Sequence, residues 1–283
     1  MRNSVVGIIL AGLAASSCTR LPQHEPAAVY GNGSKQLVVA TGSPGELGLL
    51  KVLCEEFSRE NDARVLWREA GSGESLQLLH DKQADAVMVH AASAEKKAVD
   101  EGWARLRTLV GSNEFFIVGP AEDPAGVRTA KSVVEAYQRV ARSRAKFLSR
   151  ADDSGTHKKE MAIWQKAGLV PEGDWYVRTH DFMMATLLRA NAENGYFMTD
   201  SSTWVVARSR TPNLRLLFRG DPFILNVYHA LCQPEGATPG AAVAAKFVDF
   251  LASEKAQTIL RDYGKDRYGE ALYRNAEYAR QFE

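Results

Sequence analysis

The alternation of short apolar runs with amphipathic segments constrains the fold of this chain more than any other feature. The apolar runs have the length of buried strands, and the segments between them carry apolar residues at helical spacing. In the first part of the chain the expected strands are 36–40, 63–70 and 84–90, and the expected helices are 49–61, 74–83 and 94–102. This alternation predicts an α/β fold with a mostly parallel sheet.

The alternation continues beyond a long apolar strand at 114–120. The further expected strands are 175–178, 196–199, 214–218 and 223–232, and the further expected helices are 130–144, 181–192, 240–252 and 254–263. The long apolar strands near 114–120 and 222–232 would take the chain out of a first lobe and back into it. We therefore expect lobe I at 35–118 with 222–283 and lobe II at 119–221, closing on a ligand by hinge motion.

The N-terminus has the features of an export signal. Arg2 supplies a small positive region, residues 5–15 are an apolar stretch, and Ala-Ser-Ser leads to Cys18. The apolar stretch is too short to span a membrane comfortably. We expect residues 1–18 to be a lipoprotein signal peptide with Cys18 lipidated, and 19–34 to be a flexible tether. Ordinary signal-peptidase cleavage is the alternative. Either outcome places the protein outside the cytoplasm, in the periplasm or at the cell surface.

Composition excludes some partners and leaves others open. The chain of 283 residues has a formal net charge of +1 and no basic block, so nothing indicates nucleic acid. Beyond Cys18 only Cys54 and Cys232 remain. A disulfide between them is allowed in an exported protein, but we favour two free, buried thiols.

The segment 147–164 carries the most specific chemistry. A short apolar run breaks into a polar turn and then into a helical pattern, which predicts strand, loop and helix. Ser154 and Thr156 are suited to capping the helix, and Gly155 lets backbone approach a ligand closely. Arg150 would add a planar fork of donors for an anion.

Two lysines in the first turn of this expected helix need an explanation, because cations there oppose the helix dipole. An anion held in front of the turn would offset the charge of Lys158 and Lys159. Alternatively, the lysines are solvated and Asp152 or Asp153 balances them locally. The segment alone leaves both explanations open.

A family signature matches this segment. From Ser149 to Trp164 the chain has S-R-A-D-D-S-G-T-H-K-K-E-M-A-I-W, which closely resembles the signature S-R-G-D-D-S-G-T-H-K-K-E-x-x-x-W of the TupA-like tungstate-binding proteins of ABC importers. Only Ala151 departs from it. The resemblance covers nearly all of 37–276 and implies a two-lobed type II periplasmic binding protein fold with two hinge-crossing strands. It also implies a monomer that delivers a tetrahedral oxyanion, tungstate or molybdate, to an ABC permease, without catalysis or cofactor.

The resemblance also implies a set of ligand-binding residues. They lie in four turns that follow expected strands, where helix N-termini gather at one edge of an α/β sheet. The oxyanion would be bound by Thr41, Ser43, Ser72, Arg150, Ser154, Gly155 and Thr156, and the same turns add Gly73, Met184 and Thr186. The stretches 196–200 and 220–228 resemble further family motifs, which we assign to structural or hinge roles.

Several positions depart from the family pattern. Gly42 replaces a Thr, Leu47 replaces a Ser, Phe182-Met-Met184 replaces a G-M-G turn, and Ser201 replaces an Arg. Bulky side chains in the cleft would restrict backbone approach to a small ion. A binding protein for a different small anion, or a sensory lipoprotein that has lost oxyanion transport, is therefore the alternative function.

Two other classes of site use residue types that occur in this segment. Ser154, His157 and Asp152 or Asp153 are the residue types of a hydrolytic triad, but they are close neighbours on a helix cap and lack a G-x-S-x-G turn, so we expect no enzyme. The same acids and His157 lack the spacing of a calcium loop, so we expect no metal site. Trp164 is expected in the core.

Overall fold

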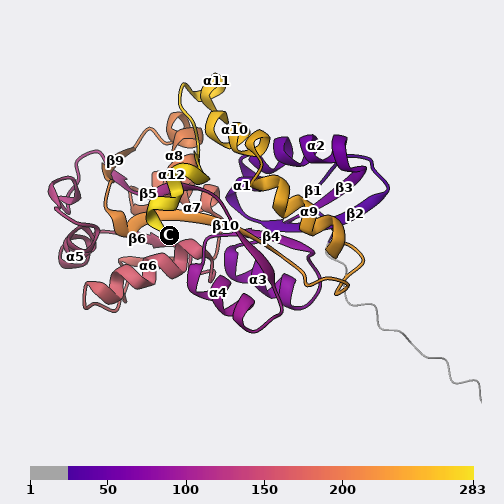
Figure 1. Ribbon diagram of the computed structural model, residues 1–283. Helices are drawn as coiled ribbons and strands as arrows, with labels where there is room; N and C mark the ends of the chain where they lie inside the picture. Colours follow the sequence, from indigo (N-terminus) through magenta and orange to yellow (C-terminus); the bar gives the residue numbers. More distant parts are fainter. Residues whose placement is uncertain (1–24) are drawn as a thin grey trace, which may run out of the picture.

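A computed structural model describes residues 25–283, and the expected signal peptide with Cys18 lies outside the described residues. Strands and helices alternate around one mixed sheet of eleven strands (Figure 1). The sheet order is β1-β3-β2-β4-β10-β5-β8-β6-β7, and β9 and β11 both pair with β5 off this path. This is the α/β, two-lobed fold that the sequence predicts.

The first lobe contains both ends of the described chain. Its strands are β1 (Ala28–Tyr30), β2 (Lys35–Thr41), β3 (Ala63–Glu69), β4 (Ala86–Val89), β10 (Leu225–Cys232) and β11 (Arg274–Asn275). Its helices are α1 (Ser43–Glu46), α2 (Leu49–Asn61), α3 (Ser72–His80), α4 (Ala92–Asp100), α9 (Ala241–Leu251), α10 (Glu254–Asp262), α11 (Lys265–Tyr268) and α12 (Ala276–Ala279), followed by the 3-10 turn η4 (Arg280–Phe282).

The second lobe is built from the middle of the chain. Its strands are β6 (Phe147–Ser149), β7 (Tyr176–Arg178), β8 (Tyr196–Asp200) and β9 (Leu214–Phe218). Its helices are α5 (Val133–Ser143), α6 (Gly155–Lys166), α7 (Met183–Glu193) and α8 (Ser201–Ala207), with the 3-10 turns η1 (Val127–Thr129), η2 (Arg208–Arg210) and η3 (Pro222–Ile224).

The strand β5 (Arg105–Pro120) joins the two lobes. Its first part pairs with β10, and residues 115–118 pair with β8 on the other side of the junction. The sequence predicted a start at residue 114, nine residues too late, because the earlier part contains polar residues and lacks a continuous apolar run. Pairing with β10 and β11 extends the strand nevertheless.

Parallel pairing sets the position of the site. β2 lies between β3 and β4 with all three strands parallel, and β6 lies in the same way between β7 and β8. The carboxyl ends of each group therefore lie at one edge of its half of the sheet, and the following helices begin there.

Each lobe has its own core. The first contains Phe57 and Phe247, whose ring centroids lie 5.2 Å apart, and the second contains Tyr137 and Trp164 at 4.4 Å. The expectation of Trp164 in the core is confirmed. Cys54 and Cys232 are buried free thiols, also as expected.

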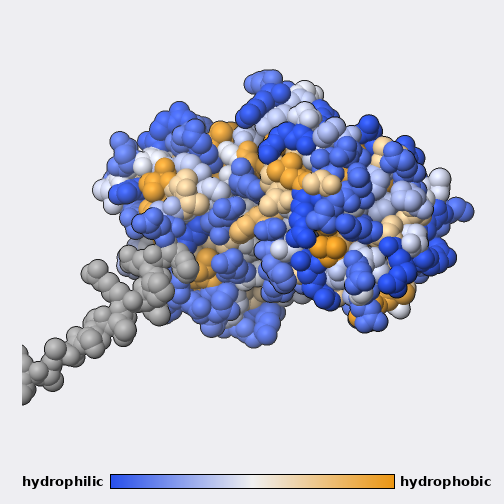
Figure 2. Space-filling model, turned by 180° about the vertical axis from the view of Figure 1, so that it is seen from behind, coloured by the Kyte–Doolittle hydropathy of each residue, from blue (hydrophilic) through white to orange (hydrophobic). Residues whose placement is uncertain are grey.

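The expected tether at 19–34 is wrong in its last part. Residues 28–30 form β1, which pairs antiparallel with β3 and places Tyr30 in the core. The strand has only three residues, and its ladder partner rather than its own sequence specifies it. Among residues 25–283, no helix is long and apolar enough to cross a membrane. Hydrophilic side chains predominate on the face opposite that of Figure 1, and apolar ones lie in small groups (Figure 2).

Candidate functional site

The loop between β6 and α6 positions the signature residues. Ser154 is the N-cap residue of α6, and its hydroxyl accepts a hydrogen bond from the backbone N–H of His157 (3.3 Å). Asp152 accepts hydrogen bonds from the hydroxyl of Ser154 (2.6 Å) and from the guanidinium of Arg150 (2.5 Å). The Arg150 side chain is only 5% exposed. A buried cation is thus held in front of a helix N-terminus by a neighbouring carboxylate.

The two lysines of the first turn are balanced by neighbouring groups. Lys158 forms an ion pair with Asp153 (2.6 Å), and Lys159 donates to the carbonyl of Phe223 (2.9 Å). The local balance that the sequence left open therefore holds for Lys158. Neither lysine lines the cleft between the lobes.

A small cleft lies where the carboxyl ends of parallel strands from both lobes meet. Its lining residues are Thr41, Gly42, Ser43, Pro44, Gly71, Ser72, Met88, His90, Arg150, Ser154, Phe182 and Tyr228. The cavity measures about 10 Å³, which is room for about one water molecule. A Cβ atom at Gly71 would lie 3.0 Å from the Cβ atom of Ser154 in the other lobe. The lobes are therefore closed on each other.

Helix N-termini converge on this cleft. Gly42, Gly71, Ser154 and Phe182 are the N-cap residues of α1, α3, α6 and α7, and all four line the cavity. The first turn of a helix has backbone N–H groups without helical partners and the positive end of the helix dipole. Three such ends, those of α3, α6 and α7, make an environment suited to an anion, whereas the single turn α1 contains Pro44 and adds little.

The predicted hydroxyl donors differ in whether their hydroxyl proton already has an acceptor. The Thr41 hydroxyl donates to the carbonyl of Met88 (2.8 Å), and that of Ser43 donates to Asp200 (3.4 Å). The Ser72 hydroxyl accepts from the backbone N–H of His90 (3.2 Å), and its proton has no acceptor within residues 25–283. Of these three side chains, Ser72 is therefore the one whose hydroxyl proton remains available.

Five predicted residues do not line the cavity. Gly155 instead allows the lobes to meet, because a Cβ atom there would lie 2.3 Å from Cε1 of His90. Thr186 is buried and hydrogen-bonded to the hydroxyl of Thr179 (3.0 Å). The residues outside the lining are Gly73, Gly155, Thr156, Met184 and Thr186. They belong to the expected turns, and Gly73 and Gly155 lie where the lobes meet, but none of the five lines the cavity.

Two aromatic residues of the lining were not predicted as site residues. The rings of His90 and Tyr228 lie 4.9 Å apart. Burial, and then the nearby charge of Arg150, lower the pKa of His90 to about 3, so its ring is neutral. His90 ends the strand expected at 84–90, so the rule that ligands bind at strand ends would have found it. Tyr228 lies within β10 and gave no such signal.

The departures from the family pattern fall in different places. Phe182 lines the cleft, and the guanidinium carbon of Arg150 lies 5.7 Å from the centroid of its ring. Leu47 and Ser201 do not line the cleft. The ring of Phe182 therefore narrows the cleft directly and contacts the guanidinium of Arg150.

Carboxylates near the cleft have raised pKa values. Burial, followed by the charges of Asp200 and Glu69, raises the pKa of Glu46 to about 7. Burial also raises the pKa of Asp200, although the backbone N–H of Thr203 (2.9 Å) stabilises its ionised form. Protonation of Glu46 reduces the negative charge around the cleft near neutral pH.

The arrangement does not match a hydrolytic triad or a metal centre. The Ser154 hydroxyl donates to Asp152, whereas Nδ1 of His157 accepts from the backbone N–H of Asp153 (3.1 Å). No hydrogen bond connects the hydroxyl with the imidazole, as a base-activated nucleophile requires. Within the described part of the chain, no group of three or more His, Cys, Asp or Glu residues is placed to hold a metal ion.

Comparisons with known proteins agree with this fold. Residues 25–255 match the family described as PBP superfamily domain. The tungstate-binding protein TupA of Peptoclostridium acidaminophilum is 32% identical over 275 residues, which cover 95% of this chain and 96% of the relative. The crystal structure of the tungstate ABC transporter from Geobacter sulfurreducens matches with 34% identity, a TM-score of 0.73, and coverage of 82% of this chain and 100% of that one. TupA from Desulfovibrio alaskensis G20 matches with 33% identity, a TM-score of 0.70, and coverage of 86% and 99%.

Proposed function

Since this chain belongs to the TupA-like family of periplasmic binding proteins, we propose that it captures a tetrahedral oxyanion for an ABC importer. Tungstate is the first candidate, in line with the names of its relatives, and molybdate is the second. The protein binds and releases its ligand without covalent chemistry. The lobes at 35–118 with 222–283 and at 119–221 close around the ion, and the closed form docks on the permease.

One observation carries this proposal. The N-cap residues of four helices line a single cleft together with the buried guanidinium of Arg150. A dehydrated oxyanion needs many hydrogen-bond donors, and charge-assisted bonds from an arginine are the strongest of them. The Ser72 hydroxyl and backbone N–H groups at the helix N-termini add neutral donors. Because the closed cavity is about 10 Å³, the lobes and Phe182 must move apart to admit the ion.

The site is proposed to work outside the cytoplasm. Cys18 would carry a lipid anchor as the first residue of the mature chain, after removal of residues 1–17, and the protein would act as a monomer at the membrane surface. Replacement of Cys18 by Ala tests the anchor. The wild type should incorporate a labelled fatty acid and the variant should not, whereas incorporation that persists in the variant would contradict lipidation at this residue.

Calorimetric titration with tungstate, molybdate, sulfate and phosphate tests the ligand. We expect tungstate or molybdate to bind, Arg150→Ala to abolish binding, and Arg150→Lys to restore part of it, because lysine keeps the charge but loses the planar fork. Arg142→Ala is the matched control, since Arg142 lies on α5 outside the cleft. Binding that survives in Arg150→Ala would contradict the assigned site. If no oxyanion binds the wild type, the alternative of another small anion or a sensory role replaces the proposal.

A further inference from the structure

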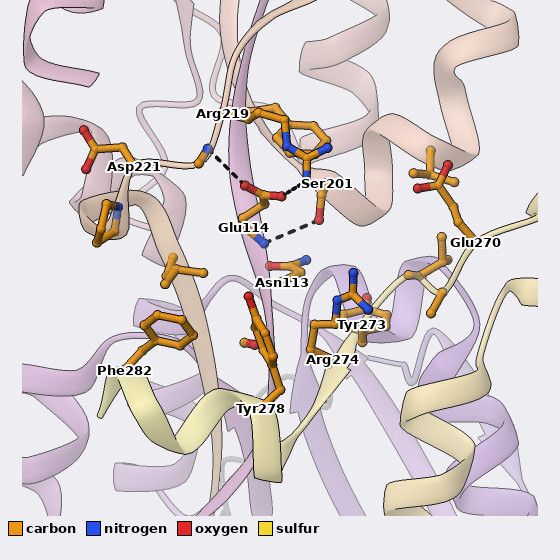
Figure 3. Close-up of a pocket in the computed structure, with 18 residues that line it drawn as sticks. Asn113, Glu114, Ser201, Arg219, Asp221, Glu270, Tyr273, Arg274, Tyr278 and Phe282 are labelled. Carbon is orange, nitrogen blue, oxygen red and sulfur yellow. Dashed lines mark hydrogen bonds and ion pairs between the residues drawn. The ribbon is translucent and has the colours of Figure 1, made fainter. Parts of the chain in front are cut away.

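A second and much larger cavity lies at the hinge (Figure 3). Its volume is about 240 Å³, compared with about 10 Å³ for the oxyanion cleft. The walls come from β5, β10, the start of α8, the turn at 219–222 and the C-terminal segment 270–282. The cavity therefore contacts both lobes and shares no lining residue with the oxyanion cleft.

The interior of this hinge cavity is partly apolar. Phe116, Val205 and Leu272 line it, and each is less than 9% exposed. Ser112 also lines it, and the buried hydroxyl of this residue has no hydrogen-bond partner among the described residues. A buried polar group without a partner is costly, and a ligand with a polar atom would satisfy it.

The carboxylates around the cavity already have partners. Glu114 pairs with Arg219, and Glu270 pairs with Arg208 (2.9 Å). Asp221 accepts hydrogen bonds from two backbone N–H groups (2.8 and 2.9 Å). Arginines therefore neutralise Glu114 and Glu270, whereas Asp221 keeps its charge and has its oxygens satisfied by neutral donors.

One cation at the cavity remains without an acidic partner. No carboxylate within residues 25–283 lies within ion-pair distance of Arg274, whose guanidinium stacks on the ring of Tyr278 with 5.7 Å to the centroid. Figure 3 shows Arg274 and Tyr278 projecting from the C-terminal segment toward the side of the cavity formed by Glu114 and Arg219. Arg274 and Tyr278 are exposed, so this charge lies at the mouth of the cavity.

We propose that the hinge cavity binds a small carboxylic acid with an apolar body of about one ring. The carboxylate pairs with Arg274 at the mouth, and the body lies against Phe116 and Leu272. The arginines of the lining are Arg219 and Arg274, and its acids are Glu114, Asp221 and Glu270. The preference for an anion therefore comes from the guanidinium of Arg274, unpaired among residues 25–283, and not from the net charge of the lining. The apolar interior selects against a fully hydrated inorganic ion. The site is independent of oxyanion capture and stands whether or not the cleft binds tungstate.

Fluorine NMR on the full chain tests this site with 4-fluorobenzoate as the probe and 4-fluorobenzamide as its neutral counterpart. We expect the acid to bind about fivefold more tightly than the amide, as an exposed ion pair allows. Arg274→Met should remove that preference, because methionine keeps an apolar stem without the charge. Arg280→Met is the matched control, since Arg280 is exposed on the same C-terminal segment but does not line the cavity. Saturating tungstate should not displace the probe.

Three results would overturn the proposal. The first is no binding of 4-fluorobenzoate, and the second is equal binding of the acid and the amide. The third is displacement of the probe by tungstate together with loss of probe binding in Arg150→Ala, which would place the probe in the cleft. If Arg274→Met does not fold, Ala271→Phe decides instead. This substitution fills the cavity from a loop position and should abolish binding, so binding that persists in a folded Ala271→Phe protein would also refute the site.

Discussion

Phe182→Ser should tighten the binding of tungstate. In the closed structure Phe182 lines the cleft and its ring stacks with the guanidinium of Arg150, 5.7 Å from the centroid to the guanidinium carbon. An ion that binds Arg150 must displace this ring, which gives up a cation–π contact of about 1 to 2 kcal/mol at a desolvated site. Removal of the ring avoids that loss and lowers the dissociation constant by about 5- to 30-fold.

Serine is the informative replacement because residue 182 is the N-cap residue of α7 and has no side-chain cap at present. A serine hydroxyl there would cap the helix and add a donor near the ion. Phe223→Ser is the matched control, since Phe223 also stacks with lysine cations but lies outside the cleft. Calorimetric titration of the two variants and the wild type gives the comparison. An unchanged or weaker affinity in a Phe182→Ser protein with normal melting temperature would refute the reasoning.

Three further predictions follow from the same structure. The pKa of Glu46 is about 7, and its ionised form repels an anion. Tungstate affinity should therefore fall as pH rises through 7, by up to about tenfold per pH unit. In Glu46→Gln the affinity measured by titration at each pH should change less with pH. Gly155→Ala should weaken tungstate binding at least about tenfold without lowering the melting temperature. The new Cβ atom would lie 2.3 Å from the His90 ring and hold the lobes open. Unchanged affinity would contradict the role of Gly155 in letting the lobes close. Burial raises the pKa of Glu160 from 4.5 to about 7, although the Tyr176 hydroxyl donates a hydrogen bond to it (2.6 Å). Between these two pH values the folded state therefore binds a proton that the unfolded state has lost. The free energy of unfolding should fall by about 3 kcal/mol as pH rises from about 4 to 7. Urea titrations at several pH values give the free energy of unfolding of the wild type and of Glu160→Gln. The wild type should lose stability more steeply with rising pH than the variant, and equal pH dependences would contradict the assignment.

The sequence predicted local elements well where one segment carried its own pattern. The helix expected at 49–61 and the strand expected at 214–218 have those bounds in the structure. Elements defined by a partner were missed or shortened, such as β1, which depends on β3, and the first part of β5, which depends on β10. The residue pattern within one segment gives no information about a pairing strand that is distant in sequence.

The same distinction applies to the candidate site. Turns that follow predicted strands identified lining residues from both lobes, including Ser72 and Arg150. The sequence does not show which residues of those turns face the cavity, so it also predicts Thr156 and Thr186, which do not line it. Tyr228 matches a family motif that we assign to structural or hinge roles, although it lines the cleft from the middle of β10.

The charge of the cleft indicates how such a site would select its ion. Arg150 is already paired with Asp152, so the pair contributes little net charge, and Glu46 and Asp200 lie nearby. A doubly charged oxyanion would therefore depend on the helix N-termini and hydroxyl donors rather than on an excess of cations. Such donors are fixed in position, so affinity depends on how closely the ion approaches them. Selection then follows ion size and donor geometry, and the ring of Phe182, which limits that approach, affects it more than an added charge would.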